Sequence, residues 1–340
     1  MAQQQHFTRS TPSHPASIHQ LSDDCLWLIV KQVSCMTEPS WSSGWQERTP
    51  LNSLSRVDKR FRQLCFPLLF NFDKLNLEGY ADFIPHMQAL ARAPYVASRL
   101  IVLKVAPHKG VAEESQYGPS LVAALMSMPN LAILCIEPYE RTDVTASFRT
   151  AFHGVTLPSV KELNIRYVPD AAFILRACPK IETFITTYPD RQWKKTLRIL
   201  PSMTSLRSVT VDAHSGFNWT HKRLSEALEF LQGFAELCFT GNLYRTKLKD
   251  LAPCFNTMCN LRILSLPLDV LFPFDDPPEE AARSYFDACS SLMTMNIMEY
   301  GPGNTFNVVR NEDGTIDRLS ATVPDAEFCR RFTHPDLRMW

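Results

Sequence analysis

The residues that could catalyse a reaction or bind a metal are scattered along this 340-residue chain. The nine histidines form no tight cluster: His214 and His221 lie seven positions apart without a nearby third ligand pair, so the spacing of a metal site is missing. The motifs G-x-x-x-x-G-K-[ST], G-x-G-x-x-G and G-x-S-x-G are absent, and Gly301-Pro302-Gly303 is typical of a turn. We therefore expect no catalytic residue, no metal and no cofactor. An enzyme whose site is assembled from distant residues stays open as an alternative.

The cysteines predict free thiols inside a cell. No two of them form a C-x-x-C pair, and most have apolar neighbours in the sequence. The polar first residues lack the apolar region of a secretory signal, and no run of about 18 apolar residues predicts a membrane span. We expect reduced, partly buried thiols and a cytoplasmic or nuclear location, or both. The ten cysteines are Cys25, Cys35, Cys65, Cys135, Cys178, Cys238, Cys254, Cys259, Cys289 and Cys329.

The charge balance argues against binding to nucleic acid. Lys+Arg and Asp+Glu number 35 each, so the formal net charge is +0. A protein that holds nucleic acid by electrostatics needs a basic excess on some surface. Apolar residues make up 45% of the chain and charged residues 21%, which is typical of a chain that buries a core. We expect protein partners rather than nucleic acid or membrane.

One pattern of apolar residues recurs along most of the chain. In the stretch 157–167, LPSVKELNIRY, the apolar positions are Val160, Leu163 and Ile165. The same spacing occurs nine times, and the first and last triplets start 220 positions apart, which gives a mean period of about 27 residues. The other triplets are Phe72/Leu75/Leu77, Leu100/Leu103/Val105, Leu131/Leu134/Ile136, Ile181/Phe184/Thr186, Leu206/Val209/Val211, Phe234/Leu237/Phe239, Leu261/Leu264/Leu266 and Leu292/Met295/Ile297.

The stretches between the triplets favour helices. We expect helices over 81–91, 119–126, 171–177, 221–231 and 279–288, with Asp170 and Thr220 as caps and Pro278 at an early position. Short strands that alternate with helices at this period are typical of leucine-rich repeats. The sequence therefore predicts an α/β fold over 71–300, a βα solenoid with parallel strands on its concave face.

The C-terminal part, 301–340, changes character. Two β-prone runs flank Asp313-Gly314 within 305–320, which predicts a hairpin. Such a hairpin would cover the open edge of the last parallel strand. A short helix is expected over 325–332 as the rest of this C-terminal cap.

The N-terminal part favours a small helical module. After a flexible tail over 1–17, we expect a helix over 19–33 with Ser22 as its N-cap, and a loop over 34–50 that contains Trp41 and Trp45. A second helix is expected over 51–65, ended by Pro67.

The arrangement over 18–70 resembles an F-box. The features on which the resemblance rests are a helix that begins with a leucine, a loop, the run LNSLSRVDKRFRQL and the segment PLLF that follows it. The resemblance implies a module that binds a Skp-type adaptor and, through it, a cullin ubiquitin ligase. The chain departs from the family in having Ser22 where proline is usual, and Asp58 and Phe61 where cysteine and tryptophan are common. The adaptor-binding residues implied by the match are Leu21, Leu26, Ile29, Leu54, Val57 and Phe61.

The strand residues beside the apolar anchors point away from the helices and form the expected substrate-binding face. They mix charges and hydroxyl groups, which suits a protein partner better than a phosphate backbone; an ordinary solvated sheet face is the alternative. Together with the resemblance, this face predicts a substrate-recognition adaptor of a cullin-type ubiquitin ligase, or alternatively a leucine-rich-repeat scaffold without a ubiquitin link. The residues of this face are Glu162, Asn164, Arg166, Thr183, Thr187, Ser208, Thr210 and Asp212.

Overall fold

The computed structural model divides the chain into two compact units, unit 1 over Met1–Phe72 and unit 2 over Asp73–Trp340. Each unit is described by itself. The residues that the structure describes are 18–36, 49–69, 74–77, 83–107, 114–138, 144–168, 170–188, 193–213, 219–241, 248–267, 277–298 and 304–322. The expected N-terminal tail, the loop tryptophans Trp41 and Trp45, and the expected helix over 325–332 lie outside these residues.

Unit 1 consists of helices in its described part. A 3₁₀ turn, Ile18–Gln20, precedes helix α1, Asp23–Met36. The hydroxyl oxygen of Ser22 accepts a hydrogen bond from the Cys25 amide at 3.3 Å, which confirms the predicted N-cap. Asp23 and Asp24 lie in the first turn, where negative charge complements the helix dipole.

The prediction of a single helix over 51–65 is wrong. The structure has helix α2, Thr49–Ser55, and helix α3, Lys59–Leu69. The carboxylate of Asp58 accepts a hydrogen bond from the Phe61 amide at 2.8 Å, so this residue caps α3 instead of continuing α2. Pro67 lies within the last turn of α3, so the prediction that it ends the helix is wrong.

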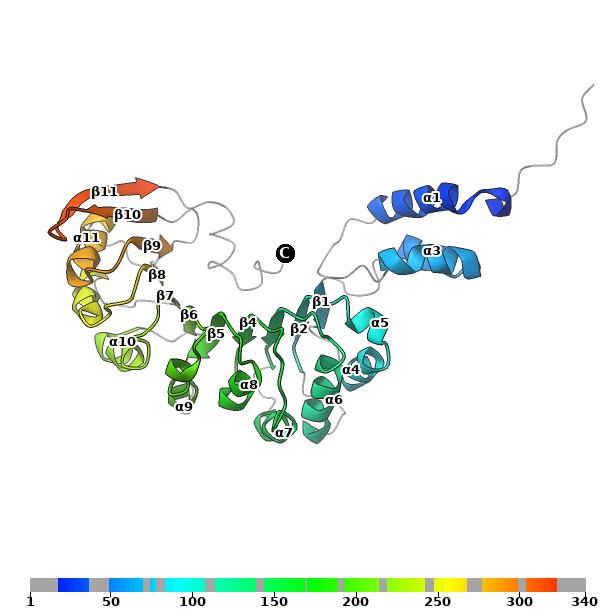
Figure 1. Cartoon of the computed structure of the whole chain (residues 1–340), viewed down its shortest axis with the longest axis horizontal. Helices are drawn as coiled ribbons and strands as arrows, with labels where there is room; N and C mark the ends of the chain where they lie inside the picture. The colour runs from blue at the N-terminus through cyan, green and yellow to red at the C-terminus, as the bar shows by residue number, and fades with distance from the viewer. Residues whose placement is uncertain are drawn as a thin grey trace, which may run out of the picture. The chain divides into compact units, whose positions relative to one another are not determined.

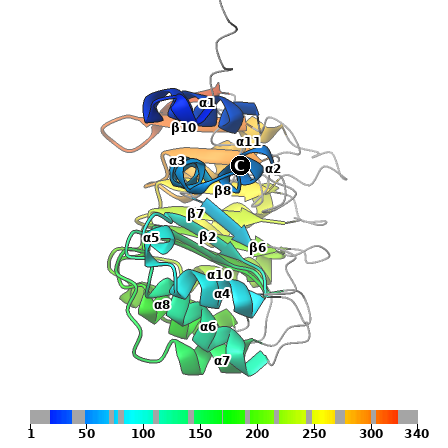
Figure 2. The ribbon, with the colours of Figure 1, turned by 90° about the vertical axis from the view of Figure 1, so that its right-hand side faces the viewer.

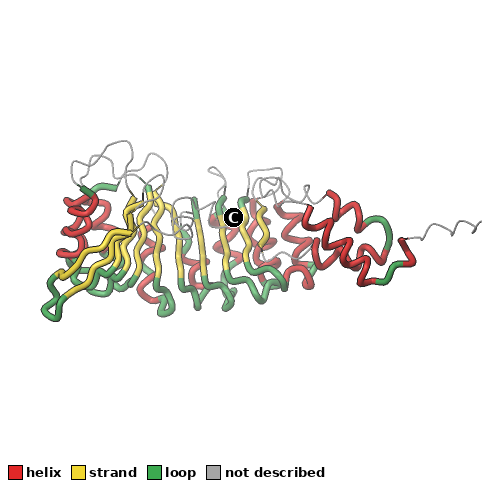
Figure 3. The backbone as a smooth tube through the Cα atoms, turned by 90° about the horizontal axis from the view of Figure 1, so that it is seen from above, coloured by secondary structure: helices red, strands yellow, loops and turns green. Residues whose placement is uncertain are grey.

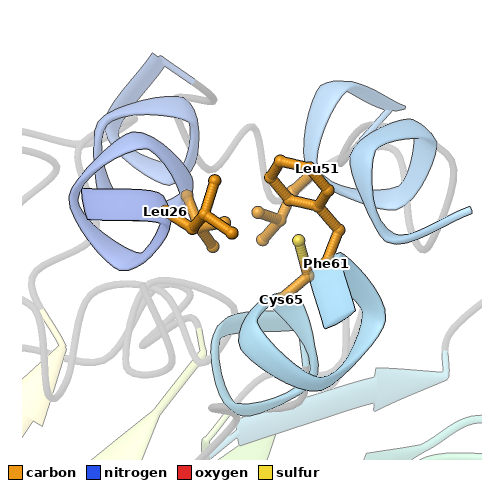
Figure 4. Packing of buried hydrophobic residues seen from close by; sticks show 5 residues of the cluster. Leu26, Leu51, Phe61 and Cys65 are labelled. Carbon is orange, nitrogen blue, oxygen red and sulfur yellow. The ribbon is translucent and has the colours of Figure 1, made fainter. Parts of the chain in front are cut away.

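The three helices of unit 1 meet around one apolar cluster. Figure 4 shows Leu26 of α1, Leu51 of α2, and Phe61 and Cys65 of α3 pointing toward one another. Val30 completes the cluster, and each of the five side chains is at most 1% exposed. The cluster is the core of unit 1, and side chains from three separate helices are needed to form it.

Unit 2 contains one sheet, and eleven strands of it lie in the described residues, in the order of the sequence from β1 to β11. The first nine are parallel to one another, and Figure 3 shows the strands side by side. The expected α/β class with a mostly parallel sheet is thereby confirmed. The strands are β1 Lys74–Leu77, β2 Val102–Val105, β3 Ile133–Ile136, β4 Glu162–Ile165, β5 Thr183–Tyr188, β6 Ser208–Ala213, β7 Glu236–Thr240, β8 Ile263–Pro267, β9 Thr294–Met298, β10 Asn304–Arg310 and β11 Ile316–Thr322.

The strand register aligns the apolar anchors of successive repeats. Leu134 of β3 pairs with Leu163 of β4, which pairs with Phe184 of β5, and the second anchors of all nine triplets align in this way. Leu163 and Phe184 are 0% exposed. The anchors of neighbouring repeats therefore bury one another, as the solenoid prediction requires.

Helices cover one face of the sheet, and the strands line the inner side of the curve that unit 2 forms (Figures 1 and 2). Thr220 caps α10 by accepting from the Arg223 amide at 3.4 Å, and Pro278 opens α11, as predicted. Gly118 permits the close approach of α6 and α7, because a Cβ there would lie 2.3 Å from the Ser147 carbonyl oxygen. The sequence did not predict α5, α7 and α9, which are short. The helices and 3₁₀ turns are α4 Phe83–Ala91, α5 Pro94–Ala97, η3 Glu114–Gln116, α6 Tyr117–Leu125, α7 Thr145–Ala151, α8 Ala172–Ala177, α9 Trp193–Leu197, η4 Leu200–Ser202, α10 His221–Leu228, η5 Leu248–Phe255 and α11 Pro278–Ala288.

The last two strands form the predicted hairpin. β10 pairs antiparallel with β11 on one side and with β9 on the other. Gly314 in the turn has a φ of 83°, which glycine adopts without steric cost. The hairpin therefore covers the edge that β9 would otherwise expose, as expected. No helix in the described residues is both long and apolar enough to cross a membrane.

Candidate functional site

The residues expected to bind an adaptor divide into two groups in unit 1. Leu26 and Phe61 belong to the core and are 1% exposed. Ile29 and Leu54 are partly buried against that core. A partner cannot reach Leu26 or Phe61 without opening the unit, so their place in the pattern reflects the packing of the three helices.

The other expected residues, Leu21 and Val57, are exposed, and the structure adds Leu28 to them. Their exposed fractions are 37%, 60% and 65% respectively. Leu28 lies within α1, whereas Leu21 precedes the N-cap Ser22 and lies outside the helix. Sequence reasoning missed Leu28, because no local pattern shows which apolar residues of α1 the packing of three helices leaves exposed.

The start of α1 and the start of α3 lie close together. The guanidinium of Arg60 donates to the carbonyl oxygen of Leu21 at 2.7 Å and pairs with Asp23. Val57 precedes Arg60 by three positions, in the turn between α2 and α3. We use the name apolar patch of unit 1 for the three exposed side chains of Leu21, Leu28 and Val57 taken together. Large exposed apolar side chains can form a surface that binds a protein.

The second candidate surface is the face of the sheet opposite the helices, which we call the inner face. Its expected residues align across neighbouring strands: Glu162 pairs with Thr183, and Thr183 with Ser208. Asn164 pairs with Ile185, which pairs with Thr210. Thr187 pairs with Asp212. Seven of the eight predicted residues thus lie on three adjacent strands, and the eighth, Arg166, directly follows β4.

The inner face is less open than expected. Asn164 and Arg166 are each only 8% exposed, and Ser208 and Thr210 are also buried. Glu162, Thr183, Thr187 and Asp212 are intermediate. Parallel strands lie about 4.8 Å apart, so side chains on one face shield their neighbours. The expectation of an ordinary solvated sheet face is therefore wrong for the middle of β4 to β6.

Charged residues form a chain of ion pairs across the inner face. Lys104 Nζ lies 3.7 Å from Glu137 Oε2, and Arg166 Nη1 lies 3.7 Å from Glu137 Oε1. On its other side, Arg166 Nη2 lies 3.4 Å from Asp212 Oδ2. The hydroxyl of Thr240 donates to Asp212. Opposite charges alternate along this chain, so each buried cation has an anion beside it.

Sequence reasoning missed Lys104, Glu137 and Thr240, although alignment of the repeats contained a signal for each. Lys104 pairs with Cys135, which pairs with Asn164, so all three occupy the same position of successive strands. Glu137 occupies the position after β3 that Arg166 occupies after β4. Thr240 pairs directly with Asp212 in the register of β6 and β7.

The eight cysteines whose side chains the structure describes are free thiols, in agreement with the prediction. Burial raises the pKa of Cys65 to about 11 and that of Cys178 to about 12, because an apolar environment disfavours the thiolate. Cys25 and Cys259 are exposed. Among the described residues, no group of three His, Cys, Asp or Glu side chains could hold a metal ion.

The sequence matches no model of a known protein family and none of the curated proteins that were compared with it.

Proposed function

We propose that this chain is a substrate-recognition adaptor of a cullin-type ubiquitin ligase. In this proposal unit 1 is an F-box-like module that binds a Skp-type adaptor. Unit 2 is a leucine-rich-repeat solenoid whose inner face binds a protein substrate. The chain itself would catalyse nothing; it would raise the effective concentration of the substrate near the ligase.

The apolar patch of unit 1 is the observation that carries the proposal. Leu28 and Val57 are each at least 60% exposed, although unit 1 has a closed core of its own. A small helical unit that needed these side chains only for folding would bury them. Large exposed apolar side chains are instead suited to a partner surface, where desolvated apolar anchors contribute most of the binding energy.

Unit 2 supports the second half of the proposal through its repeat geometry. Strands at a mean spacing of about 27 residues align their anchors in one register, and the period lies in the leucine-rich-repeat range. Solenoids of this kind present extended surfaces to protein partners. The alternating charges on the inner face fit a polypeptide better than a phosphate backbone.

Binding of the full-length chain to a purified Skp-type adaptor tests the proposal. Leu28→Asp and Val57→Asp each place a charge in the apolar patch, and we expect each to weaken binding at least about tenfold. Gln63→Asp is the matched control, because it adds the same charge at an exposed position of α3. Circular dichroism should show the same helix content in all three variants.

Two outcomes contradict the ubiquitin link. The first is a wild-type chain that does not bind the adaptor, and the second is binding that Leu28→Asp and Val57→Asp leave unchanged. Either result favours the alternative of a repeat scaffold that binds proteins without a ligase. Leu26→Asp would not discriminate between these functions, because Leu26 belongs to the core and its loss unfolds the unit.

A further inference from the structure

Two buried polar atoms of the inner face lack hydrogen-bond partners. They are Asn164 Oδ1 and Arg166 Nε, and they are two of the four such side-chain atoms in the described residues. Asn164 lies in β4 and Arg166 directly follows this strand; the pairing of Arg166 with Asp212 of β6 places its side chain on the same inner face. A buried acceptor or donor without a partner destabilises a fold. Both atoms are inaccessible to solvent in this conformation, so a ligand reaches them only after the two side chains turn toward it.

The neighbours of Asn164 offer its carbonyl oxygen little. In the strand register, Asn164 lies between Cys135 of β3 and Ile185 of β5. The side chain of Ile185 has no polar group, and a thiol is at most a weak donor. The acceptor of Asn164 therefore needs a donor from outside these strands.

The two terminal nitrogens of Arg166, Nη1 and Nη2, each lie near one carboxylate but at a long distance. Their distances to Glu137 and Asp212 are 3.7 and 3.4 Å, longer than the 2.7–2.9 Å of a charge-assisted hydrogen bond. The next residue, Tyr167, has a φ of 56°, and its amide donates to Thr187 Oγ1 at 3.2 Å. This uncommon backbone conformation fixes the direction of the chain directly after Arg166.

The charges around the two atoms are already balanced. Lys104 and Arg166 are matched by Glu137 and Asp212 in one chain of ion pairs. A charged ligand would add an unmatched charge to a largely buried group, which is costly. A neutral ligand avoids this cost, and it must offer one acceptor to Arg166 and one donor to Asn164.

An amide group meets both requirements, because it carries a carbonyl acceptor and an N–H donor. We propose that Asn164 and Arg166 form a subsite for an amide group of a polypeptide partner. The partner's carbonyl oxygen accepts from Arg166 Nε, and its N–H donates to Asn164 Oδ1. The amide can belong to the peptide backbone or to an Asn or Gln side chain. This inference rests on the proposed role of the inner face in binding a protein substrate.

Selection from a library of random 12-residue peptides against the full-length chain tests the subsite. The affinities of the selected peptides are then measured for the wild type and for two variants. Asn164→Leu removes the acceptor at similar volume, and Arg166→Lys removes the Nε donor but retains the charge. We expect each variant to weaken binding about tenfold or more. The control Lys161→Gln, at an exposed position before β4, should change the affinity less than twofold.

Two further experiments show whether the bound amide belongs to the peptide backbone or to a side chain. Replacement of Asn or Gln in a selected peptide by alanine abolishes binding if a side-chain amide fills the subsite. Methylation of one backbone nitrogen abolishes it if a peptide group does. Thermal unfolding shows whether each variant is folded. Hydrogen exchange of the wild type is independent of the variants, and bound peptide should slow exchange in β4 and β5.

The subsite is refuted if no peptide is selected, if both variants bind as the wild type does, or if β4 and β5 gain no protection. Binding of the Skp-type adaptor is measured with the same preparations. Retained adaptor binding with a negative peptide result removes the subsite alone and leaves the ligase role. Lost adaptor binding with a positive peptide result removes the ubiquitin link and leaves the subsite.

Discussion

Unit 1 and unit 2 bury their apolar side chains in different ways. In unit 1 a single cluster of five residues joins three helices (Figure 4). In unit 2 the anchors form a line through nine parallel strands, and each anchor packs against those of the neighbouring repeats. A small unit with one core has little stability to lose, whereas a repeat array distributes its stability over many similar interfaces. The two units should therefore respond differently to equivalent changes.

The largest difference is expected from removing one buried leucine in each unit. Leu51 and Leu163 are 1% and 0% exposed, so Leu51→Ala and Leu163→Ala should each cost about 2–5 kcal/mol. In unit 1 this cost is comparable with the stability of the whole unit, and α1 to α3 should unfold together. In unit 2 the loss of stability should be largest in β4 and in the strands next to it. Hydrogen exchange, measured separately over residues 18–69 and 74–322, reports the unfolding of each unit.

Leu28→Ala serves as the control for this pair, because Leu28 is 65% exposed and its loss should change the stability by less than about 0.5 kcal/mol. If Leu163→Ala exposes all eleven strands of the described sheet at once, the repeat unit is as cooperative as the helical unit. The contrast between a single core and a distributed one would then be wrong.

A smaller effect is expected from the matched helix caps. Ser22 caps α1 in unit 1 and Thr220 caps α10 in unit 2, each through one side-chain oxygen. Ser22→Ala and Thr220→Ala should each cost about 1 kcal/mol. Urea denaturation, followed by one probe in each unit, should show a larger fractional loss of stability in unit 1. Equal fractional losses would show that the two units have similar stabilities.

The smallest perturbation compares one buried with one exposed thiol in each unit. The pKa values of Cys65 and Cys178, about 11 and about 12, keep both thiols protonated at pH 8. From the thiolate fraction alone, alkylation should be slower than at an ordinary thiol, about a hundredfold for Cys65 and about a thousandfold for Cys178. Cys25 and Cys259 are the exposed controls. Mass spectrometry of iodoacetamide-labelled peptides measures the four rates.

The pH dependence of labelling has a definite sign. Because burial raises both pKa values, the alkylation rates of Cys65 and Cys178 should still increase between pH 9 and pH 11. If Cys65 is labelled as fast as Cys25 at pH 8, the core of unit 1 opens frequently. That result would increase the difference in stability between the two units, since local opening exposes a buried thiol without full unfolding.

The regular parts of both units could be predicted from short sequence patterns. The triplets such as Val160, Leu163 and Ile165 identified the strands, because a strand alternates its faces every second residue. Ser22 and Thr220 identified helix starts, because a cap depends on an amide three positions away. Asp313-Gly314 identified the hairpin through its turn. Each of these signals acts within a few residues.

The wrong predictions have a common cause. In each case the contact that determined the structure was not visible in a local pattern of the sequence. The run over 51–65 has a continuous helical pattern of apolar residues, yet Asp58 caps a second helix within it. Leu26 and Leu28 look alike in the sequence, but only the packing of three helices buries one and exposes the other. The burial of Arg166 likewise depends on residues of two other strands.

The amino-acid sequence is sufficient to predict the repeat period, the anchors, the terminal hairpin and the division into a helical part and a strand–helix part. These features follow from local periodicity and turn chemistry, which act within one repeat. Which polar side chains contact one another follows from the tertiary fold and not from any local pattern. Arg166 follows β4, and its partner Asp212 lies on β6, two strands away in the sheet. Such a contact depends on the register between strands, and register is set by the packing of all the repeats together.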